Sequence, residues 1–168
     1  MSFRESFFLS VSDHLPKSHL FDEYRFVVLK LAGIKISGRC LIWTPLIVRQ
    51  IGGAKNIFIG NGTFINSECR FGCPVDPVVI GQRVMVGPRV SFETMSHSLH
   101  LVAGKGRSGN SKKILVEDDV WIGANCCILD GVTIEKGCVI GAGSVVTKSL
   151  PAYSIAIGAP AVVVKKRM

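Results

Sequence analysis

The hydrophobic positions of this chain repeat every six residues over most of its length. An unbroken run of aliphatic residues comprises Val116, Ile122, Ile128, Ile134, Ile140 and Val146, and the same phase includes Ile80, Val86 and Phe92. A second stretch, offset by three residues, comprises Leu41, Ile47, Gly53, Ile59, Ile65 and Phe71. Fifteen hexads are counted in this way. The period of six fits neither an α-helix nor the alternation of an ordinary strand.

Two further features accompany the hexads. Small apolar residues lie two positions before many of the repeat positions, at Val78, Val84, Val90, Ile114, Val120, Cys126, Val132 and Cys138. Glycines directly follow several of the repeat positions, at Gly60, Gly81, Gly87, Gly123 and Gly141. This grouping describes a short strand and a tight turn in which glycine takes backbone angles closed to other residues. Three such sides make an eighteen-residue coil, and coils stacked about 4.8 Å apart place the aliphatic residues in internal ladders. The pattern therefore predicts five coils of a parallel β-solenoid.

The repeat also divides the chain into two parts. Residues 1–40 lack it, and the solenoid domain is expected over 41–168. Within that domain the hexad lapses between Phe92 and Val116, which predicts an excursion loop at about 93–115. A C-terminal cap is expected at about 149–168.

The N-terminal part is predicted to contain an amphipathic helix at about residues 18–32. Helical spacing before a glycine supports it, through Leu20, Tyr24, Val27, Val28 and Leu31. This helix either packs against the solenoid end or a neighbouring subunit, which we favour, or makes peripheral contact with an anionic membrane surface.

Composition and charge narrow the class of protein. The 168 residues are 48% hydrophobic and 19% charged, which argues against disorder and against a coiled coil. No apolar run reaches the roughly 20 residues of a membrane-spanning helix, so a cytoplasmic location is expected. The net charge of +8 favours anionic ligands, and without a nucleic-acid motif we assign it to phosphate groups rather than to nucleic acid. The six cysteines lack zinc-ligand spacing, so free thiols and no metal are expected.

A family resemblance is carried by three segments. They read WIGAN at 121–125, GAGSVVTK at 141–148 and IGAP at 157–160. Together they resemble the hexapeptide-repeat acyltransferase superfamily, in its maltose and galactoside O-acetyltransferase branch, over about residues 41–168. The resemblance implies an all-β fold: a left-handed parallel β-helix solenoid with a short N-terminal helical segment and one long excursion loop. It also implies acetyl-CoA as co-substrate and a homotrimer with active sites between neighbouring solenoids.

One histidine of the excursion is the candidate catalytic base. The segment at 92–99 resembles the family segment that carries the catalytic histidine, with His97 in that place. A hydroxyl that attacks a thioester needs a base, and imidazole titrates near pH 6.5. We therefore predict His97 as general base, with Glu93 as a candidate for orienting its ring and His100 as a solvated loop residue. Without the hexads, His97 itself would read as a solvated loop histidine.

The acceptor and donor residues are implied by the same resemblance. Asn66, 31 residues before His97, falls at the family's acceptor-binding asparagine, although a turn asparagine in a left-handed conformation explains it as well. The family's paired aspartates are missing, and Asp76 alone approximates their role. The positions that contact coenzyme A in the family correspond here to Trp121, Ala124, Ala142, Thr147, Lys148 and Lys165. Small residues let a pantetheine arm approach the backbone, and lysines neutralise its phosphates.

These residues favour an acetyl-CoA-dependent O-acetyltransferase that acts on a sugar or glycan hydroxyl. We expect it in bacterial surface polysaccharide biosynthesis, in the cytoplasm or at the inner membrane surface. Three alternatives stay open. They are N-acetylation of an amino sugar, serine acetylation, for which residues 1–40 are too short to hold the usual helical domain, and a non-catalytic β-helix scaffold.

Overall fold

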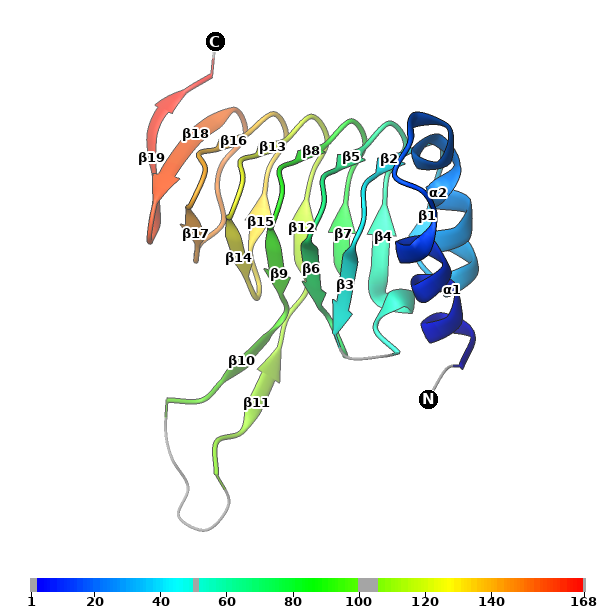
Figure 1. The fold of residues 1–168 in the computed structure, drawn as a ribbon. Coiled ribbons are helices and arrows are strands. Elements are labelled where there is room, and N and C mark those ends of the chain that lie inside the picture. The colour runs from blue at the N-terminus through cyan, green and yellow to red at the C-terminus, as the bar shows by residue number, and fades with distance from the viewer. Residues whose placement is uncertain (1–2, 50–51, 100–105, 168) are drawn as a thin grey trace.

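The computed structural model describes residues 3–49, 52–99 and 106–167. Two helices, α1 (Phe3–His14) and α2 (His19–Ala32), lie at one end of a stack of coils, and one hairpin projects from the side of the stack (Figure 1). The coils form three sheets that run along the stack, which we call sheets A, B and C.

The three sheets contain one strand from each coil. Sheet A consists of β1 (Lys35–Ile36), β4 (Ile57–Ile59), β7 (Val78–Ile80), β12 (Ile114–Val116) and β15 (Thr133–Ile134). Sheet B consists of β2 (Leu41–Ile42), β5 (Phe64–Ile65), β8 (Met85–Val86), β13 (Trp121–Ile122), β16 (Val139–Ile140) and the cap strands β18 (Ser154–Gly158) and β19 (Ala161–Lys166). Sheet C consists of β3 (Leu46–Arg49), β6 (Cys69–Gly72), β9 (Ser91–Glu93), β14 (Cys127–Leu129) and β17 (Val145–Val146). The chain visits A, B and C in turn, so five coils result and the parallel β-solenoid is confirmed. We name the three lines of turns between sheets the A/B, B/C and C/A edges.

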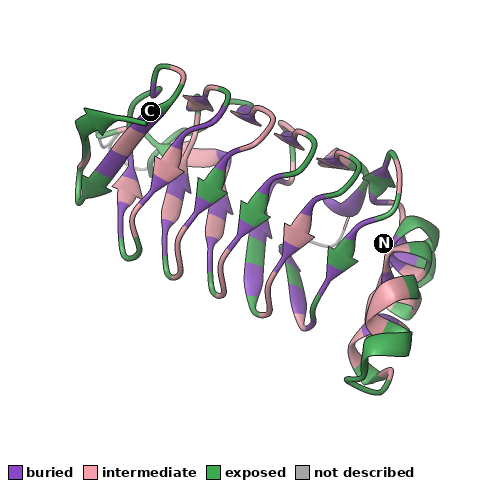
Figure 2. Cartoon of the chain, turned by 90° about the horizontal axis from the view of Figure 1, so that it is seen from above, coloured by how far each residue is buried: buried purple, intermediate pink, exposed green. Residues whose placement is uncertain are grey.

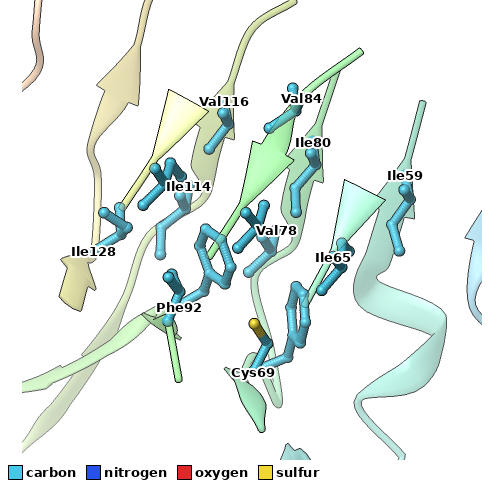
Figure 3. Close-up of a cluster of buried hydrophobic side chains, with 14 of the residues drawn as sticks. Ile59, Ile65, Cys69, Val78, Ile80, Val84, Phe92, Ile114, Val116 and Ile128 are labelled. Carbon is cyan, nitrogen blue, oxygen red and sulfur yellow. The ribbon is translucent and has the colours of Figure 1, made fainter. Parts of the chain in front are cut away.

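Buried ladders run the length of the stack and explain the six-residue repeat. In sheet A, strand pairing aligns Ile36, Ile59, Ile80, Val116 and Ile134. In sheet B it aligns Ile42, Ile65, Val86, Ile122 and Ile140, and in sheet C it aligns Val48, Phe71, Phe92, Ile128 and Val146. The rings of Phe71 and Phe92 stack 5.0 Å apart. The small apolar residues two positions earlier are also buried, so each side contributes two side chains to the core (Figures 2 and 3).

The first coil corrects the predicted phase of the repeat. Leu41 and Ile47 were expected inside but are 36% exposed, and their neighbours Ile42 and Val48 are buried instead. The short helix η1 (Ala54–Asn56) and its flanking residues lengthen the first C/A turn by five residues, which moves the phase and leaves Gly53 outside any ladder. Because both members of these strand pairs are aliphatic, only closure of the coil decides which one points inward. Strand β1 pairs with β4, so the coils begin at Lys35 rather than at residue 41.

The turn glycines act by allowing close approach, which corrects their predicted role. A Cβ atom on Gly123 would lie 2.6 Å from the backbone nitrogen of Ala142, and one on Gly60 would lie 2.4 Å from the backbone of Gly81. None of the five predicted glycines has a positive φ. The left-handed residues lie two positions later in the turns, for example Arg83, at φ 53°. Glycine is needed where one coil contacts the backbone of the next.

The N-terminal helices cover the first coil. The predicted helix at 18–32 is confirmed as α2, which ends at Gly33 with φ 111°. It packs on the solenoid through Leu29, which belongs to the buried core. The buried Arg25 guanidinium joins α2 to the end of α1, because it bonds to Asp22 and to the carbonyl oxygens of Ser12 and Pro16. The predicted apolar face instead points away from the coils, because Leu20, Tyr24, Val27 and Leu31 are exposed. Membrane contact through residues 18–32 stays a prediction. Within the described ranges, neither helix is long and apolar enough to cross a bilayer.

Within the described residues, the predicted excursion at about 93–115 contains the two strands of a β-hairpin. Strands β10 (Met95–His97) and β11 (Gly109–Ser111) pair antiparallel and leave the stack between β9 and β12, at the C/A edge (Figure 1). His100 lies outside the described residues.

The buried thiols should make the protein less stable at alkaline pH. All six cysteines are free, and burial raises the pKa of Cys69 to about 11. Burial, together with the charges of Glu93 and Glu5, raises the pKa of Cys73 to about 12. An unfolded thiol titrates near 9.0, so between about pH 9 and 12 the unfolded chain loses protons that the folded chain keeps. We therefore expect the free energy of unfolding to fall as pH rises through this window.

Chemical denaturation at about pH 8 and about pH 10.5 tests this expectation. The variant Cys69→Ala/Cys73→Ala, although less stable overall, should lose less stability between the two pH values than the wild type. An equal loss in both proteins would contradict the assignment to these thiols.

Candidate active site

His97 ends strand β10 on the outer part of the hairpin stalk. Its cross-strand neighbour is Gly109, which has no side chain to cover the imidazole. The side chain is exposed, and its ring forms no hydrogen bond within the described part of the chain. Both ring nitrogens are therefore open to a ligand or to a second subunit.

The base of this stalk is held by hydrogen bonds to two turns of the C/A edge, the one between β6 and β7 and the one between β14 and β15. The Thr94 hydroxyl donates to the carbonyl oxygen of Gly72 at 3.1 Å, and the Ser96 hydroxyl lies 3.2 Å from a carboxylate oxygen of Asp130. On the other strand, the Ser111 hydroxyl accepts from the backbone N–H of Asp76 at 3.2 Å. Sequence reasoning identified Asp76 but missed Asp130, because a turn aspartate one coil further along carries no signal that it contacts the hairpin.

Glu93 does not orient the imidazole, contrary to expectation. Its carboxylate accepts from the Arg70 guanidinium at 2.6 Å and from the Ser91 hydroxyl at 2.5 Å, on the outer face of sheet C. The alternation along β9 places Glu93 on the sheet, whereas the hairpin carries His97 away from it.

Asn66 lies in the B/C turn of the second coil. Its carbonyl oxygen accepts from the backbone N–H of Ser67 at 2.7 Å, so the carboxamide is held in place. Its NH₂ group has no partner among the described residues and is free to donate. The alternative role as a left-handed turn residue is wrong, since Glu68 takes that conformation instead, at φ 62°.

The predicted donor residues fall into three groups. Ala124 and Ala142 occupy equivalent B/C turns of adjacent coils, where the carbonyl oxygen of Ala124 accepts from the N–H of Gly143 at 2.8 Å. Thr147 and Lys148 follow β17 at the C/A edge, and both are exposed. Trp121 points outward from sheet B and is 52% exposed, and Lys165 lies on cap strand β19 opposite Ile155.

Apart from Trp121 and Lys165, which lie on sheet B and its cap strand, the predicted residues divide between two edges of the solenoid. His97, Asp76, Thr147 and Lys148 belong to the C/A edge, and Asn66, Ala124 and Ala142 to the B/C edge. Sheet C separates the edges, and its four-residue strand β6 is about 13 Å long at about 3.3 Å per residue. One chain does not bring Asn66 to His97.

A groove of about 560 Å³ lies where sheet B meets the A/B edge. It joins the rings of Trp121 and Tyr153 to the cationic side chains of Arg83, Lys136 and Arg167. Asp119 also lines it, and its hydrogen bond to Arg83 lowers the pKa of that carboxyl. Sequence reasoning placed Trp121 and the basic C-terminus near a phosphate-bearing ligand but missed Arg83 and Lys136, because only the stacking of coils aligns them. Among the described side chains, no group of His, Cys, Asp and Glu is placed to hold a metal ion.

Sequence comparison finds related proteins. The profile of the family described as bacterial transferase hexapeptide (six repeats) matches residues 113–148. A galactoside O-acetyltransferase of Lactococcus lactis is 35% identical over 144 residues, which are 86% of this chain and 68% of that protein.

Solved structures share the fold. A hexapeptide-repeat acetyltransferase of Vibrio cholerae, solved in complex with acetyl coenzyme A, superposes with a TM-score of 0.83 at 29% identity and covers 98% of this chain and 86% of its own. A maltose O-acetyltransferase of Clostridium difficile superposes with a TM-score of 0.81 at 28% identity, over 98% of this chain and 84% of its own.

Proposed function

Because the chain belongs to the hexapeptide-repeat acyltransferases, in the galactoside and maltose O-acetyltransferase branch, and its solenoid is a left-handed parallel β-helix, we propose that it transfers an acetyl group from acetyl-CoA to a sugar hydroxyl. That it is an acetyltransferase follows from the family. The base, the acceptor and the biological role are our proposal. The observation that carries it is the exposed imidazole of His97, which lies on a hairpin whose base is held by hydrogen bonds.

The chemistry needs one base and no change of oxidation state. His97 takes the proton of the acceptor hydroxyl as its oxygen attacks the carbonyl carbon of the thioester. The tetrahedral intermediate then expels the thiolate of coenzyme A, which receives that proton from the imidazolium. The products are an acetyl ester and the free coenzyme thiol, and the imidazole returns neutral. The hydrogen bonds of Thr94, Ser96 and Ser111 fix the root of the hairpin and so hold His97, further out on the same hairpin, in position.

The division of residues between two edges supports a homotrimer with composite sites. In a closed trimer each chain presents its C/A edge to the B/C edge of the next chain, a heterologous contact that closes after three copies. His97 and Asp76 of one subunit would then face Asn66 of its neighbour. The hairpin, which projects beyond its own coils, is suited to reach across that contact (Figure 1).

The small residues and the cations support the donor assignment. We propose that the pantetheine arm passes Ala124 and Ala142, where no side chain larger than a methyl group intervenes. Lys148 and Lys165 neutralise phosphate groups, and Arg167 adds a further cation beside Trp121. This use of cations accounts for part of the net charge of +8.

The acceptor class and the setting extend this proposal. Asn66 and Asp76 offer one amide donor and one carboxylate, which suits the hydroxyl groups of a sugar. We place the enzyme in surface polysaccharide biosynthesis and in the cytoplasm, where the six unpaired cysteines persist as thiols. N-acetylation of an amino sugar and acetylation of serine remain the rival reactions.

Two measurements test the proposal. Acetyl-CoA should raise the thermal unfolding temperature of the purified protein, as mass action requires of a ligand that binds the folded state. In the presence of acetyl-CoA the protein should form acetyl esters on sugars, with the modified oxygen located by NMR. Transfer to serine or to an amino nitrogen at least as efficient as to any sugar hydroxyl would overturn the O-acetyltransferase proposal.

A further inference from the structure

A second cavity lies beside Asn66 and belongs to none of the roles above. It encloses about 320 Å³ where the N-terminal helices meet the B/C edge of the first two coils. Three parts of the chain contribute to its lining: Lys17 and Asp22, then Trp43 and Thr44, then Ser67 and Glu68. The backbone N–H of Ser67 also donates to the side-chain oxygen of Asn66, so the predicted acceptor residue lies next to the lining of the cavity.

The aromatic wall of the cavity is positioned in advance. The ring of Trp43 packs edge-to-face against Phe64, with centroids 5.1 Å apart and an interplanar angle of 84°. It nevertheless stays 40% exposed. A held indole that still presents surface can stack against the C–H groups of a flat ligand at little cost in conformational entropy.

The charged groups around the ring keep unused hydrogen-bonding capacity. Asp22 uses one carboxylate oxygen to accept from Arg25, and its other oxygen has no hydrogen bond within the described residues. Neither Lys17 nor Glu68 forms an ion pair with any side chain that the structure describes. Lys17 and Glu68 are both exposed, so their charged groups remain available to a ligand that enters the cavity.

The charges define the ligand class. Asp22 is already paired with Arg25, so the charges left for a ligand are the Glu68 carboxylate and the Lys17 ammonium, which balance each other and favour a ligand without net charge. An apolar ligand would make no hydrogen bond to either group. A neutral molecule rich in hydroxyl groups fits both conditions, since hydroxyls donate to carboxylates and accept from an ammonium.

We propose that this cavity, lined by Trp43, Asp22, Glu68 and Lys17, is a subsite for a neutral sugar unit adjoining the one that is acetylated. The inference rests on the proposed function and deepens it, because it assigns the enzyme an acceptor of two or more sugars. The volume lies at the lower end of the roughly 300–1,000 Å³ typical of ligand pockets, so it holds one ring rather than a chain. The adjoining unit stacks on Trp43 while the neighbouring sugar lies at Asn66.

Matched acceptors test the subsite in the full-length protein. Acetylation is measured with glucose against maltose and with methyl β-galactoside against lactose. For at least one pair, the wild type should show a kcat/KM about tenfold higher for the disaccharide, since aromatic stacking and one added hydrogen bond supply that much. Trp43→Leu should reduce the kcat/KM for the disaccharide to that for the monosaccharide, with the KM for acetyl-CoA unchanged. Trp43→Phe should restore most of the preference.

The control is Leu41→Ala, an outward residue of the same coil with similar exposure that does not line the cavity. It should keep the disaccharide preference. If the wild type acetylates monosaccharides as well as disaccharides, or if Trp43→Leu weakens both alike, the subsite is wrong and the acetyltransferase proposal stands. If no sugar among the four is acetylated while serine or an amino sugar is, the proposed function fails and the subsite with it.

Discussion

Replacement of His97 by alanine is expected to lower kcat by about 10²–10⁴, the usual contribution of a positioned general base. The KM for acetyl-CoA should change little, because the imidazole acts on the acceptor hydroxyl in the transition state and not on the bound donor. His97 lies at an exposed position opposite Gly109, so the substitution removes no core contact and the variant should unfold at the wild-type temperature. Steady-state kinetics together with a thermal melt measure all three quantities.

A surface histidine supplies the matched control. His19 lies on α2, where its ring is 3.7 Å from the Glu23 carboxylate at a largely exposed position. His19→Ala should therefore keep kcat within about twofold, as substitutions at exposed sites usually do. Full activity in the His97 variant would refute the assignment of the base. An equal loss in both variants would indicate a change in folding or assembly instead.

Mixing two inactive variants is expected to restore activity. His97→Ala removes the base from the C/A edge and Asn66→Ala removes the amide from the B/C edge, and each should be nearly inactive alone. If both groups of one site came from the same chain, mixed oligomers would stay inactive. In a trimer with composite sites, random mixing of equal amounts leaves about a quarter of the sites with both groups intact. The unfractionated mixture should therefore recover about a quarter of the wild-type rate, and isolated mixed trimers, each with one intact site of its three, should recover about a third.

Complementation needs exchange of subunits, so the two variants are co-expressed with different affinity tags and the doubly tagged oligomers are isolated. Light scattering gives the mass, for which a trimer is three times the 18.2 kDa chain. Each variant co-expressed with itself serves as the control. An active monomer, or mixed oligomers with no more activity than either parent, would show that the site belongs to one chain.

The sequence predicted the solenoid because a physical constraint repeats along it. Each inward ladder position of a coil is surrounded by the coils above and below, so it favours an apolar residue, and the constraint returns every six residues. The same logic failed in the first coil, where Leu41 and Ile42 are both aliphatic and hydrophobicity alone does not choose between them. The turn glycines were identified by position but explained wrongly, since the lack of space for a Cβ atom is a property of two adjacent coils and not of one turn.

The candidate site was predictable residue by residue and not as an arrangement. Asn66 and Asp76 were selected by the family resemblance of their segments, and His97 by that resemblance and by the chemistry of its side chain. Asp130 contacts the hairpin, Glu93 is paired with Arg70, and Trp43 joins Lys17 at one cavity. All three contacts join residues 23 to 34 positions apart in the chain. No local pattern reports such contacts, because they arise only when complete coils stack.

What the sequence alone determined is the period of the fold, the number of coils, the place of the excursion and the identity of the candidate base. The tertiary structure decided which member of each aliphatic pair faces inward and which face of α2 packs on the coils. It also decided that Asn66 and His97 lie on opposite edges of sheet C. The reason is that a six-residue repeat specifies contacts along the stack, which are the same at every coil. Which residues fall at which edge depends on the path of the whole chain around the three sheets. The insertions between coils set that path.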